Sequence, residues 1–215
     1  MTIIVVFACK SNTCRSQMAE GWAHEWVHTK REEIHQDFTE NGNASARIER
    51  LRSFLGRVRI ASVALDATAI YKECSREAPI EKCCGDTCNS TRELKVVKEK
   101  AVHAMAEDGI DISRYAPKCV KELLPSLCTN LSSSHADKKR PVDKLVLLCS
   151  CGDEVKRDLV RQSKSVEEWN VDAPTALSKG PEGESAYRRV SHEIRREVDS
   201  LMERLTMDDG SCLWN

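Results

Sequence analysis

Apolar residues in this chain gather in a few short runs, separated by stretches in which they recur at helical spacing. Residues 3–8 are six apolar side chains in a row, rich in β-branched types, which is typical of a buried parallel strand. From Ser16 the apolar positions follow at steps of three and four residues, at Met18, Ala19, Trp22, Ala23 and Trp26. This spacing predicts a helix directly after the polar loop that ends the strand.

The loop between this strand and this helix runs from Cys9 to Arg15, with five residues between them. Backbone N–H groups and a helix N-terminus converge at such a loop and favour an anion. A thiol there, beside a guanidinium, ionises readily and becomes a nucleophile, while the arginine fork can hold two oxygens of the anion. We therefore predict that Cys9 attacks a tetrahedral oxyanion such as phosphate or arsenate. The predicted anion-binding residues are Lys10, Ser11, Asn12, Thr13, Cys14, Arg15 and Ser16.

A second cysteine–arginine pair with the same spacing occurs later, from Cys151 to Arg157. Its loop carries Asp153 and Glu154, whose charges would repel an anion and keep the thiol protonated. We interpret this copy as a chance match. The competing interpretation of the first copy is a buried structural cysteine with a solvated Arg15, but a basic residue at a helix start is unfavourable without an anion nearby.

Further along the chain, the same patterns predict more strands and helices. Strands are expected around residues 58–63, at 142–149 and, as a short last strand, at 167–172. This order of elements predicts a three-layer α/β/α sandwich around a small parallel sheet of about four strands. Helices are expected at 47–55, at 95–108 with Gly109 as the C-cap, at 120–124 and at 184–205.

The composition of the 215 residues narrows the function classes. A formal net charge of −1 argues against a nucleic-acid partner held by bulk electrostatics. No apolar run approaches the length of a membrane span and the first residues lack a signal-peptide pattern, so we expect a cytoplasmic protein without a membrane partner. The patterns favour one α/β domain over residues 1–205, with insertions at about 66–92 and 129–140 and a C-terminal tail at 206–215.

Eleven cysteines in such a chain are more often thiols, redox centres or metal ligands than a disulfide framework. Four of them lie in the first insertion: Cys74, Cys83, Cys84 and Cys88. Their spacing matches no standard zinc pair, and adjacent cysteines rarely ligate one tetrahedral metal. We expect no metal and interpret the insertion as a loop of free or regulatory thiols, with zinc as the alternative.

The sequence from Cys9 to Trp22 resembles the phosphate-binding loop of low-molecular-weight protein tyrosine phosphatases. Within it, the run CRSQMAEGW is more similar to the related thiol-dependent arsenate reductases. The resemblance spans most of the chain and implies the phosphatase-like α/β fold together with one of these two activities. It returns in AVHAMAEDGIDIS at 101–113, LVLLC at 145–149, WNVDAP at 169–174 and the closing helix at 187–205.

The resemblance implies roles for cysteines outside the loop. Cys149 stands where the reductases carry a second, attacking cysteine; the alternative is that it simply packs at a strand end. The thioredoxin-coupled enzymes carry a third cysteine seven residues further on, but this chain has Lys156 there, so Cys151 is the neighbour that could replace it. A Cys149–Cys151 disulfide would be strained and easily reduced.

The general acid that the resemblance implies is an aspartate directly before a proline. In this chain Ala173 precedes Pro174, and Asp172 is one position earlier, which turns its side chain towards the opposite face of an extended segment. Asp172 is still the best candidate for the acid. Asp153 is the runner-up, because the loop after Cys149 can approach the site.

Three functions are compatible with these residues. In the first, arsenate is reduced to arsenite through an adduct on Cys9 and a Cys9–Cys149 disulfide; no tightly bound cofactor is implied, and thioredoxin or a low-molecular-weight thiol restores the enzyme. In the second, the protein is a tyrosine or aryl phosphate phosphatase with a phosphocysteine intermediate, although Thr175 and Ala176 replace the tyrosine pair that follows the family's Asp-Pro. In the third, the protein is a thiol-rich arsenite or metal binder, or a redox sensor. The sequence favours the reductase.

Overall fold

The computed structural model describes residues 2–41, 45–71, 93–120, 123, 141–150 and 153–207. None of the helices in these ranges is long and apolar enough to cross a membrane. Several sequence predictions fall outside the described residues: Cys74, Cys83, Cys84, Cys88, Cys151, the insertion at 129–140 and the tail after Met207.

Four parallel strands form a sheet in the order β2-β1-β3-β4. They are β1 (Ile3–Cys9), β2 (Val58–Ala64), β3 (Val142–Leu147) and β4 (Ser163–Glu168). β1 pairs with β2 over its whole length and with β3 on its other side, so it lies inside the sheet and its apolar run is buried. The predicted parallel sheet of about four strands is confirmed.

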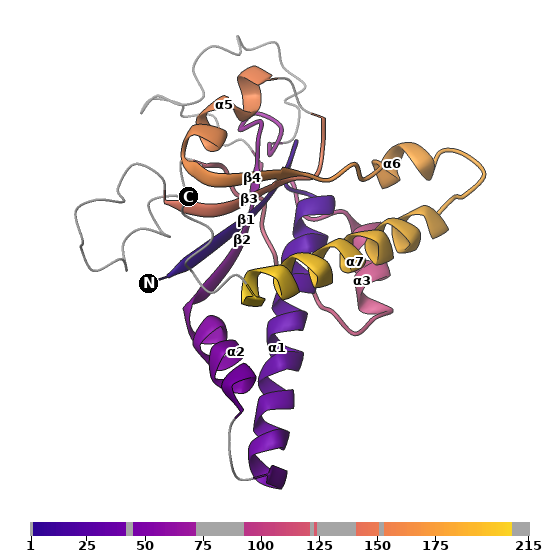
Figure 1. Ribbon diagram of the computed structural model, residues 1–215. Helices are drawn as coiled ribbons and strands as arrows, with labels where there is room; N and C mark the ends of the chain where they lie inside the picture. The colour runs from indigo at the N-terminus through magenta and orange to yellow at the C-terminus, as the bar shows by residue number, and fades with distance from the viewer. Residues whose placement is uncertain are drawn as a thin grey trace.

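Helices in the described part of the chain cover both faces of this sheet (Figure 1). They are α1 (Arg15–Asn41), α2 (Ala46–Arg57), α3 (Glu99–Ala106), α5 (Asp153–Arg161), α6 (Pro174–Leu177) and α7 (Ser185–Met207). Helices α1, α3 and α7 pack against one another on one face, and α5 lies on the other (Figure 1). The predicted three-layer α/β/α arrangement is therefore confirmed.

Alternate residues of β1 enter two different cores. Val5, Phe7 and Cys9 belong to the core formed with α1, α3 and α7. Ile4 and Val6 belong to the smaller core beneath α5. This division follows from the two-residue repeat of a strand, whose side chains point to opposite faces in turn. A strand that is covered on both faces therefore needs an uninterrupted apolar run, which β1 has.

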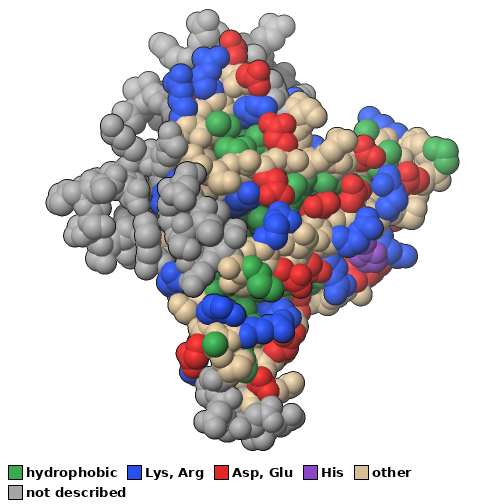
Figure 2. Space-filling model, in the orientation of Figure 1, with side chains coloured by type: hydrophobic (Ala, Val, Ile, Leu, Met, Phe, Trp, Pro, Cys, Tyr) green, Lys and Arg blue, Asp and Glu red, His purple; other side chains and the backbone are tan. Residues whose placement is uncertain are grey.

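The outer face of α7 carries a mixture of acidic and basic side chains (Figure 2). Arg189 pairs with Glu182 and Arg204 with Glu167, each with a nitrogen–oxygen distance of 2.9 Å. The opposite face of α7 is apolar and buried, for example at Ile194. The closing helix predicted at 184–205 is thus confirmed as an amphipathic helix.

β4 and α5 differ from the sequence prediction because they bury few side chains. The last strand, expected at 167–172, is β4 and spans Ser163–Glu168; it is an edge strand with partly exposed side chains, so it contains no apolar run. The sequence pattern does not predict helix α5, because Leu159 is the one fully buried side chain among the described residues of this helix. Helix α3 spans Glu99–Ala106 rather than residues 95–108, and its C-cap is Glu107 rather than Gly109. Gly109 follows the helix with a φ of 82°, in the left-handed region that is common just after a helix end.

Gly21 lies where α1 packs against two fully buried side chains. A Cβ at this position would come within 2.9 Å of Ile112 Cγ2 and 3.0 Å of Met105 Cε. Replacing a helical glycine by alanine normally stabilises a protein by about 1 kcal/mol. For Gly21→Ala we expect the opposite sign, a loss of roughly 1–3 kcal/mol in the free energy of unfolding, because the packed core has no room.

Urea unfolding measures this change in stability, with Gly56→Ala as the control, since a Cβ on Gly56 would meet nothing within 4 Å. A Gly21→Ala variant as stable as that control would contradict the packing described here.

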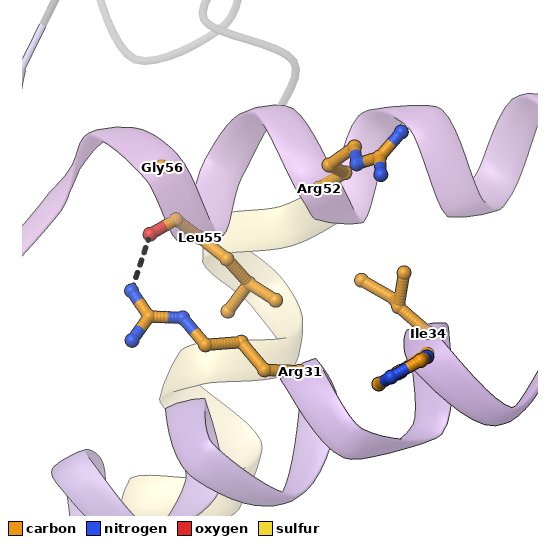
Figure 3. A pocket seen from close by; sticks show the side chains of 6 residues that line it. Arg31, Ile34, Arg52, Leu55 and Gly56 are labelled. Atoms are coloured by element: carbon orange, nitrogen blue, oxygen red, sulfur yellow. Dashed lines mark hydrogen bonds between the residues drawn. The ribbon is translucent and has the colours of Figure 1, made fainter.

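A pocket of about 440 Å³ lies between α1 and α2 (Figure 3). Arg31 and Ile34 line it from α1, and Arg52 and Leu55 line it from α2. The Arg31 guanidinium donates to the Leu55 carbonyl at 3.2 Å, near the end of α2, where carbonyls lack helical partners. At 1.5 Å per residue the pocket lies roughly 24 Å along α1 from Arg15, so it is separate from the loop at Cys9.

Candidate active site

The candidate site lies at the carboxyl edge of the sheet, where β1 ends at Cys9. In register, Cys9 pairs with Ala64 of β2, and Ala8 pairs with Leu147 of β3. The chain passes from β1 to β2 on one side and later returns to β3 on the other, so the strand order reverses between β1 and β3. Ligands of open parallel sheets bind outside the carboxyl ends of the strands at such a point.

The loop between β1 and α1 takes its shape from Asn12. This residue has a positive φ of 51° and is fully buried. Asparagine adopts such a left-handed conformation more readily than most residues. Its side-chain amide donates to Ser16 Oγ at 2.9 Å and accepts from the backbone N–H of Lys118 at 2.7 Å, so the loop is held from two sides. Ser11 Oγ and Thr13 Oγ1, 2.9 Å apart, add a contact within the loop.

The predicted anion-binding residues differ in exposure. The side chain of Lys10 is exposed and that of Ser11 is half-buried, whereas Thr13 is buried. The carbonyl of Thr13 accepts a hydrogen bond from the backbone N–H of Lys98 at 2.9 Å. The loop is therefore anchored along its length, and Lys10 is the loop side chain with the most access to solvent.

The sulfur of Cys9 lies 2.9 Å from the hydroxyl oxygen of Ser16, which is in the first turn of α1. The Cys9 side chain is buried. A hydroxyl group and a helix N-terminus beside a sulfur are groups that stabilise a thiolate. The arrangement can therefore support nucleophilic attack by Cys9.

Cys14 is the second thiol of the loop, and its environment is different. Burial, and then the negative charge of Cys9, raise the pKa of the Cys14 thiol to about 12, although Lys98 and Arg15 act in the opposite direction. Cys14 therefore stays protonated at neutral pH. The carbonyl of Cys14 accepts from the N–H of Met18 at 2.9 Å and so belongs to the first turn of α1.

Arg15 is the first residue of α1, and its side chain is half-buried. Its Nη1 donates to the carbonyl oxygen of Val171 at 2.6 Å. A guanidinium has five N–H donors, so this bond leaves four with which to hold an anion. The same side chain therefore connects the loop to the segment that follows β4.

The segment after β4 carries Asp172, the candidate general acid. The side chain of Asp172 is 66% exposed and lies 3.8 Å from Arg189 of α7. The segment is attached on both sides of Asp172, by Arg15 to the carbonyl of Val171 and by Lys98, whose Nζ donates to Thr175 Oγ1 at 2.6 Å. The structure thus places Asp172 on a stretch of chain that is hydrogen-bonded to the loop from Cys9 to Arg15.

Cys149 lies at the same edge of the sheet as Cys9. The N–H of the preceding residue, Leu148, donates to the carbonyl of Ala8 at 2.8 Å, which continues the pairing of β3 with β1. Cys149 is a half-buried thiol that packs against both cores. Cys9 is the last residue of β1, and Cys149 follows two residues after the end of β3, the neighbouring strand.

The other candidate residues near Cys149 point elsewhere or lie outside the described ranges. Asp153 begins α5, is exposed and lies 3.3 Å from the ammonium of Lys156. Lys156 also lies 2.7 Å from Glu168 at the end of β4, so it is engaged in ion pairs. Among the hydrogen bonds and ion pairs of the described residues, none joins Asp153 to the loop from Cys9 to Arg15, and Cys151 is not among the described residues.

Sequence reasoning missed four polar residues behind the loop: Gln17, Glu20, Ser62 and Lys118. Gln17 Nε2 donates to the carbonyl and the side-chain oxygen of Asn12, 3.0 Å each. Glu20 joins Ser62 and Lys118 in a partly buried cluster. The sequence offers a signal for Glu20 alone, because this charged residue directly follows Met18 and Ala19, which are buried on α1. Ser62 and Lys118 carry no comparable signal.

Within the described ranges, no group of three or more His, Cys, Asp or Glu side chains could hold a metal ion.

No protein-family model and no curated protein matches the sequence significantly. Solved structures do match the fold. An arsenate reductase in the phosphate-binding state superposes with a TM-score of 0.52 at 20% sequence identity, covering 94% of this chain and 98% of that chain. A low-molecular-weight protein tyrosine phosphatase from T. tengcongensis has a TM-score of 0.51 at 19% identity, covering 94% and 99%.

A third solved structure is the YwlE arginine phosphatase, in a cysteine-to-serine mutant with a phosphorylated active-site serine. It matches with a TM-score of 0.54 at 16% identity, covering 96% of this chain and 97% of that chain. Together these similarities show that this chain has the low-molecular-weight protein tyrosine phosphatase-like fold, an architecture shared by arsenate reductases and phosphatases.

Proposed function

We propose that this protein is a thiol-dependent arsenate reductase. Cys9 attacks the arsenic of arsenate, a Cys9 S–As bond forms and an oxygen leaves as water. Cys149 then attacks the sulfur of Cys9, the S–As bond breaks and its electron pair stays on arsenic. Two thiols are thereby oxidised to a Cys9–Cys149 disulfide, and As(V) is reduced to As(III), which leaves as arsenite.

The observation that carries this proposal is the position of Cys149, two residues after the end of β3, the strand that pairs with β1 and thus with the strand that ends at Cys9. A phosphatase has no need of a second thiol there, whereas a reductase needs one that can reach the first sulfur. Both electrons come from the protein's own thiols, so the reaction needs no tightly bound cofactor. Each cycle ends in a disulfide, which an external thiol reductant, thioredoxin or a low-molecular-weight thiol, must reduce.

The solved structures support the anion and the nucleophile in this proposal. One reductase of this fold was captured in a phosphate-binding state, and one phosphatase carries phosphate on the serine that replaces its active-site cysteine. By analogy, residues 10–16 would hold the arsenate and Arg15 would grip two of its oxygens. Below 25% identity these likenesses establish the fold, so the activity rests on the cysteines described above.

A phosphatase acting on tyrosine or aryl phosphates is the second candidate. The hydrogen bond from Arg15 to the carbonyl of Val171 favours this candidate, because it connects the loop from Cys9 to Arg15 with the segment that carries Asp172. It is disfavoured by the surroundings of Asp172, whose side chain is 66% exposed and lies 3.8 Å from Arg189 of α7. Thr175 and Ala176 also stand where the phosphatases carry a tyrosine pair.

Mass spectrometry after arsenate treatment tests the reductase proposal. The protein is incubated with arsenate without a reductant, alkylated and digested. We expect a peptide pair joined by Cys9 and Cys149 in an amount stoichiometric with the arsenite released. Incubation with phosphate should give no such pair, because phosphate cannot accept the two electrons. If arsenate leaves both cysteines fully alkylatable, the proposal fails.

A further inference from the structure

Lys98 connects the loop from Cys9 to Arg15 with the segment that follows β4. It lies directly before α3, and its backbone N–H donates to the carbonyl of Thr13 at 2.9 Å. Its ammonium nitrogen Nζ donates to Thr175 Oγ1 at 2.6 Å. The backbone of Lys98 therefore contacts the loop, while its side chain contacts the same segment that accepts a hydrogen bond from Arg15.

The position of Lys98 in α3 gives no local reason for a lysine. Lys98 is the N-cap of this helix, and its side chain makes no capping hydrogen bond. N-caps are usually serine, threonine, aspartate or asparagine, whose oxygens accept from the first N–H groups of a helix. An ammonium cannot accept, and a positive charge at this end opposes the helix dipole. The lysine is therefore unfavourable for α3 unless an anion lies nearby.

Arg15 is a second basic residue at a helix start beside the same loop. It is the first residue of α1, as Lys98 is the residue before the first turn of α3. Burial, and then the charge of Cys9, raise the pKa of the Cys14 thiol to about 12, while Lys98 and, less strongly, Arg15 act to lower it. The two positive charges therefore both act on one residue of the loop.

Two carboxylates near Lys98 are directed to other cations. Glu99, the next residue in the chain, is 86% exposed and lies 3.9 Å from His103. Asp172, on the segment that Lys98 contacts, is 66% exposed and lies 3.8 Å from Arg189. Among the ion pairs of the described residues, none includes Lys98.

The ammonium of Lys98 has hydrogen bonds left to give. An ammonium has three N–H donors, and Thr175 uses one of them. Arg15 also keeps donors beyond the one that Val171 accepts, and no ion pair of the described residues includes Arg15. Two like charges near one another repel, and an anion held by both would remove this repulsion.

We propose that Lys98 is a second anion-binding side chain of the candidate site, beside Arg15, and that the site binds a doubly charged tetrahedral oxyanion such as hydrogen arsenate or hydrogen phosphate. Arg15 holds two oxygens of this anion and the ammonium of Lys98 holds another, so two positive charges face two negative ones. The inference rests on the anion-binding role of the loop in the proposed function, but not on the reduction step.

Protection of Cys9 from iodoacetamide by phosphate tests this proposal in Lys98→Met. The measurement is made at pH 8, where phosphate is mainly a dianion, and peptide mass spectrometry identifies Cys9 as the labelled site. The phosphate concentration that halves the alkylation rate should rise about tenfold, the size of effect that a hydrogen bond between charged groups supports. Lys98→Arg keeps a cation and should keep most of the protection.

Thr175→Val separates anion binding from a merely structural role of Lys98. Valine resembles threonine in shape but lacks the hydroxyl, so this variant loses the hydrogen bond to Lys98 and leaves the ammonium in place. We expect phosphate to protect Cys9 in Thr175→Val as it does in the wild type. If Lys98 only fastened the segment to the loop, Thr175→Val and Lys98→Met would lose protection equally, and that result would overturn the proposal.

Lys95 provides a matched control three positions earlier in the chain. Its side chain is also half-buried, but its ammonium donates to the carbonyl of Ala69 at 2.8 Å, on the segment after β2. Lys95→Met should leave the protection by phosphate unchanged. An equal loss in Lys95→Met and Lys98→Met would overturn the proposal, since it would indicate an effect of net charge alone.

A measurement on the wild-type chain covers the case in which Lys98→Met does not fold. Saturating phosphate should slow the acetylation of Lys98 by acetic anhydride several-fold and leave that of Lys95 unchanged. Equal acetylation of Lys98 with and without phosphate would overturn the proposal. Wild-type protection of Cys9 that does not depend on Lys98 would overturn this inference alone, whereas a wild type that phosphate does not protect would overturn the anion-binding loop as well.

Discussion

Replacing Cys9 by serine is expected to abolish turnover of any oxyanion, with a loss of about 10⁴-fold or more in kcat. Serine at this position is a far weaker nucleophile at neutral pH, and it cannot form a disulfide with Cys149. Cys14→Ser should retain turnover within about tenfold, because burial and the charge of Cys9 keep the Cys14 thiol protonated, with a pKa of about 12. The two variants are compared by arsenite release in the presence of a thiol reductant.

The same contrast appears without a substrate in alkylation experiments. A thiol with a pKa of about 12 binds its proton at every pH well below that value, so Cys14 should stay unlabelled by iodoacetamide at pH 8. Cys9 should be labelled first, and phosphate or arsenate should protect it by occupying the loop. If Cys14 is labelled as fast as Cys9, or if phosphate gives no protection, the loop does not bind an anion as proposed.

Replacing Cys149 by serine is expected to separate the two candidate activities. A reductase would stop after a single adduct on Cys9, because no second thiol attacks that sulfur, and steady-state arsenite release should fall by about 10³-fold or more. A phosphatase would keep its rate with para-nitrophenyl phosphate, since water completes that reaction. The experiment therefore gives opposite results for the two proposals.

Cys119→Ser is the matched control for this variant. Cys119 is a buried thiol at the same edge of the sheet, beyond β2, where it forms a bridge with Ala64. It lies two positions from β1 rather than next to it, so its replacement should leave both activities unchanged. Arsenite release that persists in Cys149→Ser but disappears in Cys119→Ser would show that the second thiol has been assigned to the wrong residue.

The parts of the fold that could be predicted from sequence are those with dense apolar patterns. β1 and the apolar stretch of β3 are buried on both faces, so their runs of apolar residues leave few alternatives. Helix α7 shows a clear helical repeat because one face is buried and the other is charged. β4 and α5 lie at the edge of the structure and bury little, and for that reason their patterns are indistinct.

The candidate site also has one part that could be predicted from sequence and another part that could not. The loop from Cys9 to Arg15 could be predicted because its strand, loop and helix are consecutive in the chain. The roles of Cys149 and Asp172 came from a resemblance. The structure places Cys149 two residues after the end of β3, and a hydrogen bond from Arg15 connects the loop with the segment of Asp172. Their chemical roles stay predictions until the variants above are measured.

By itself the sequence determined an α/β chain in which Cys9 and Arg15 bracket the loop between a strand and a helix, because the pattern of strand, loop and helix is local. Only the tertiary structure decided which segments surround this loop. The strand order that puts β3 beside β1 is not encoded in any local pattern, and Lys118 reaches Glu20 across 98 positions of sequence. Such contacts depend on how distant segments pack once the core has formed, so the ion pair between Glu20 and Lys118 appears only in three dimensions.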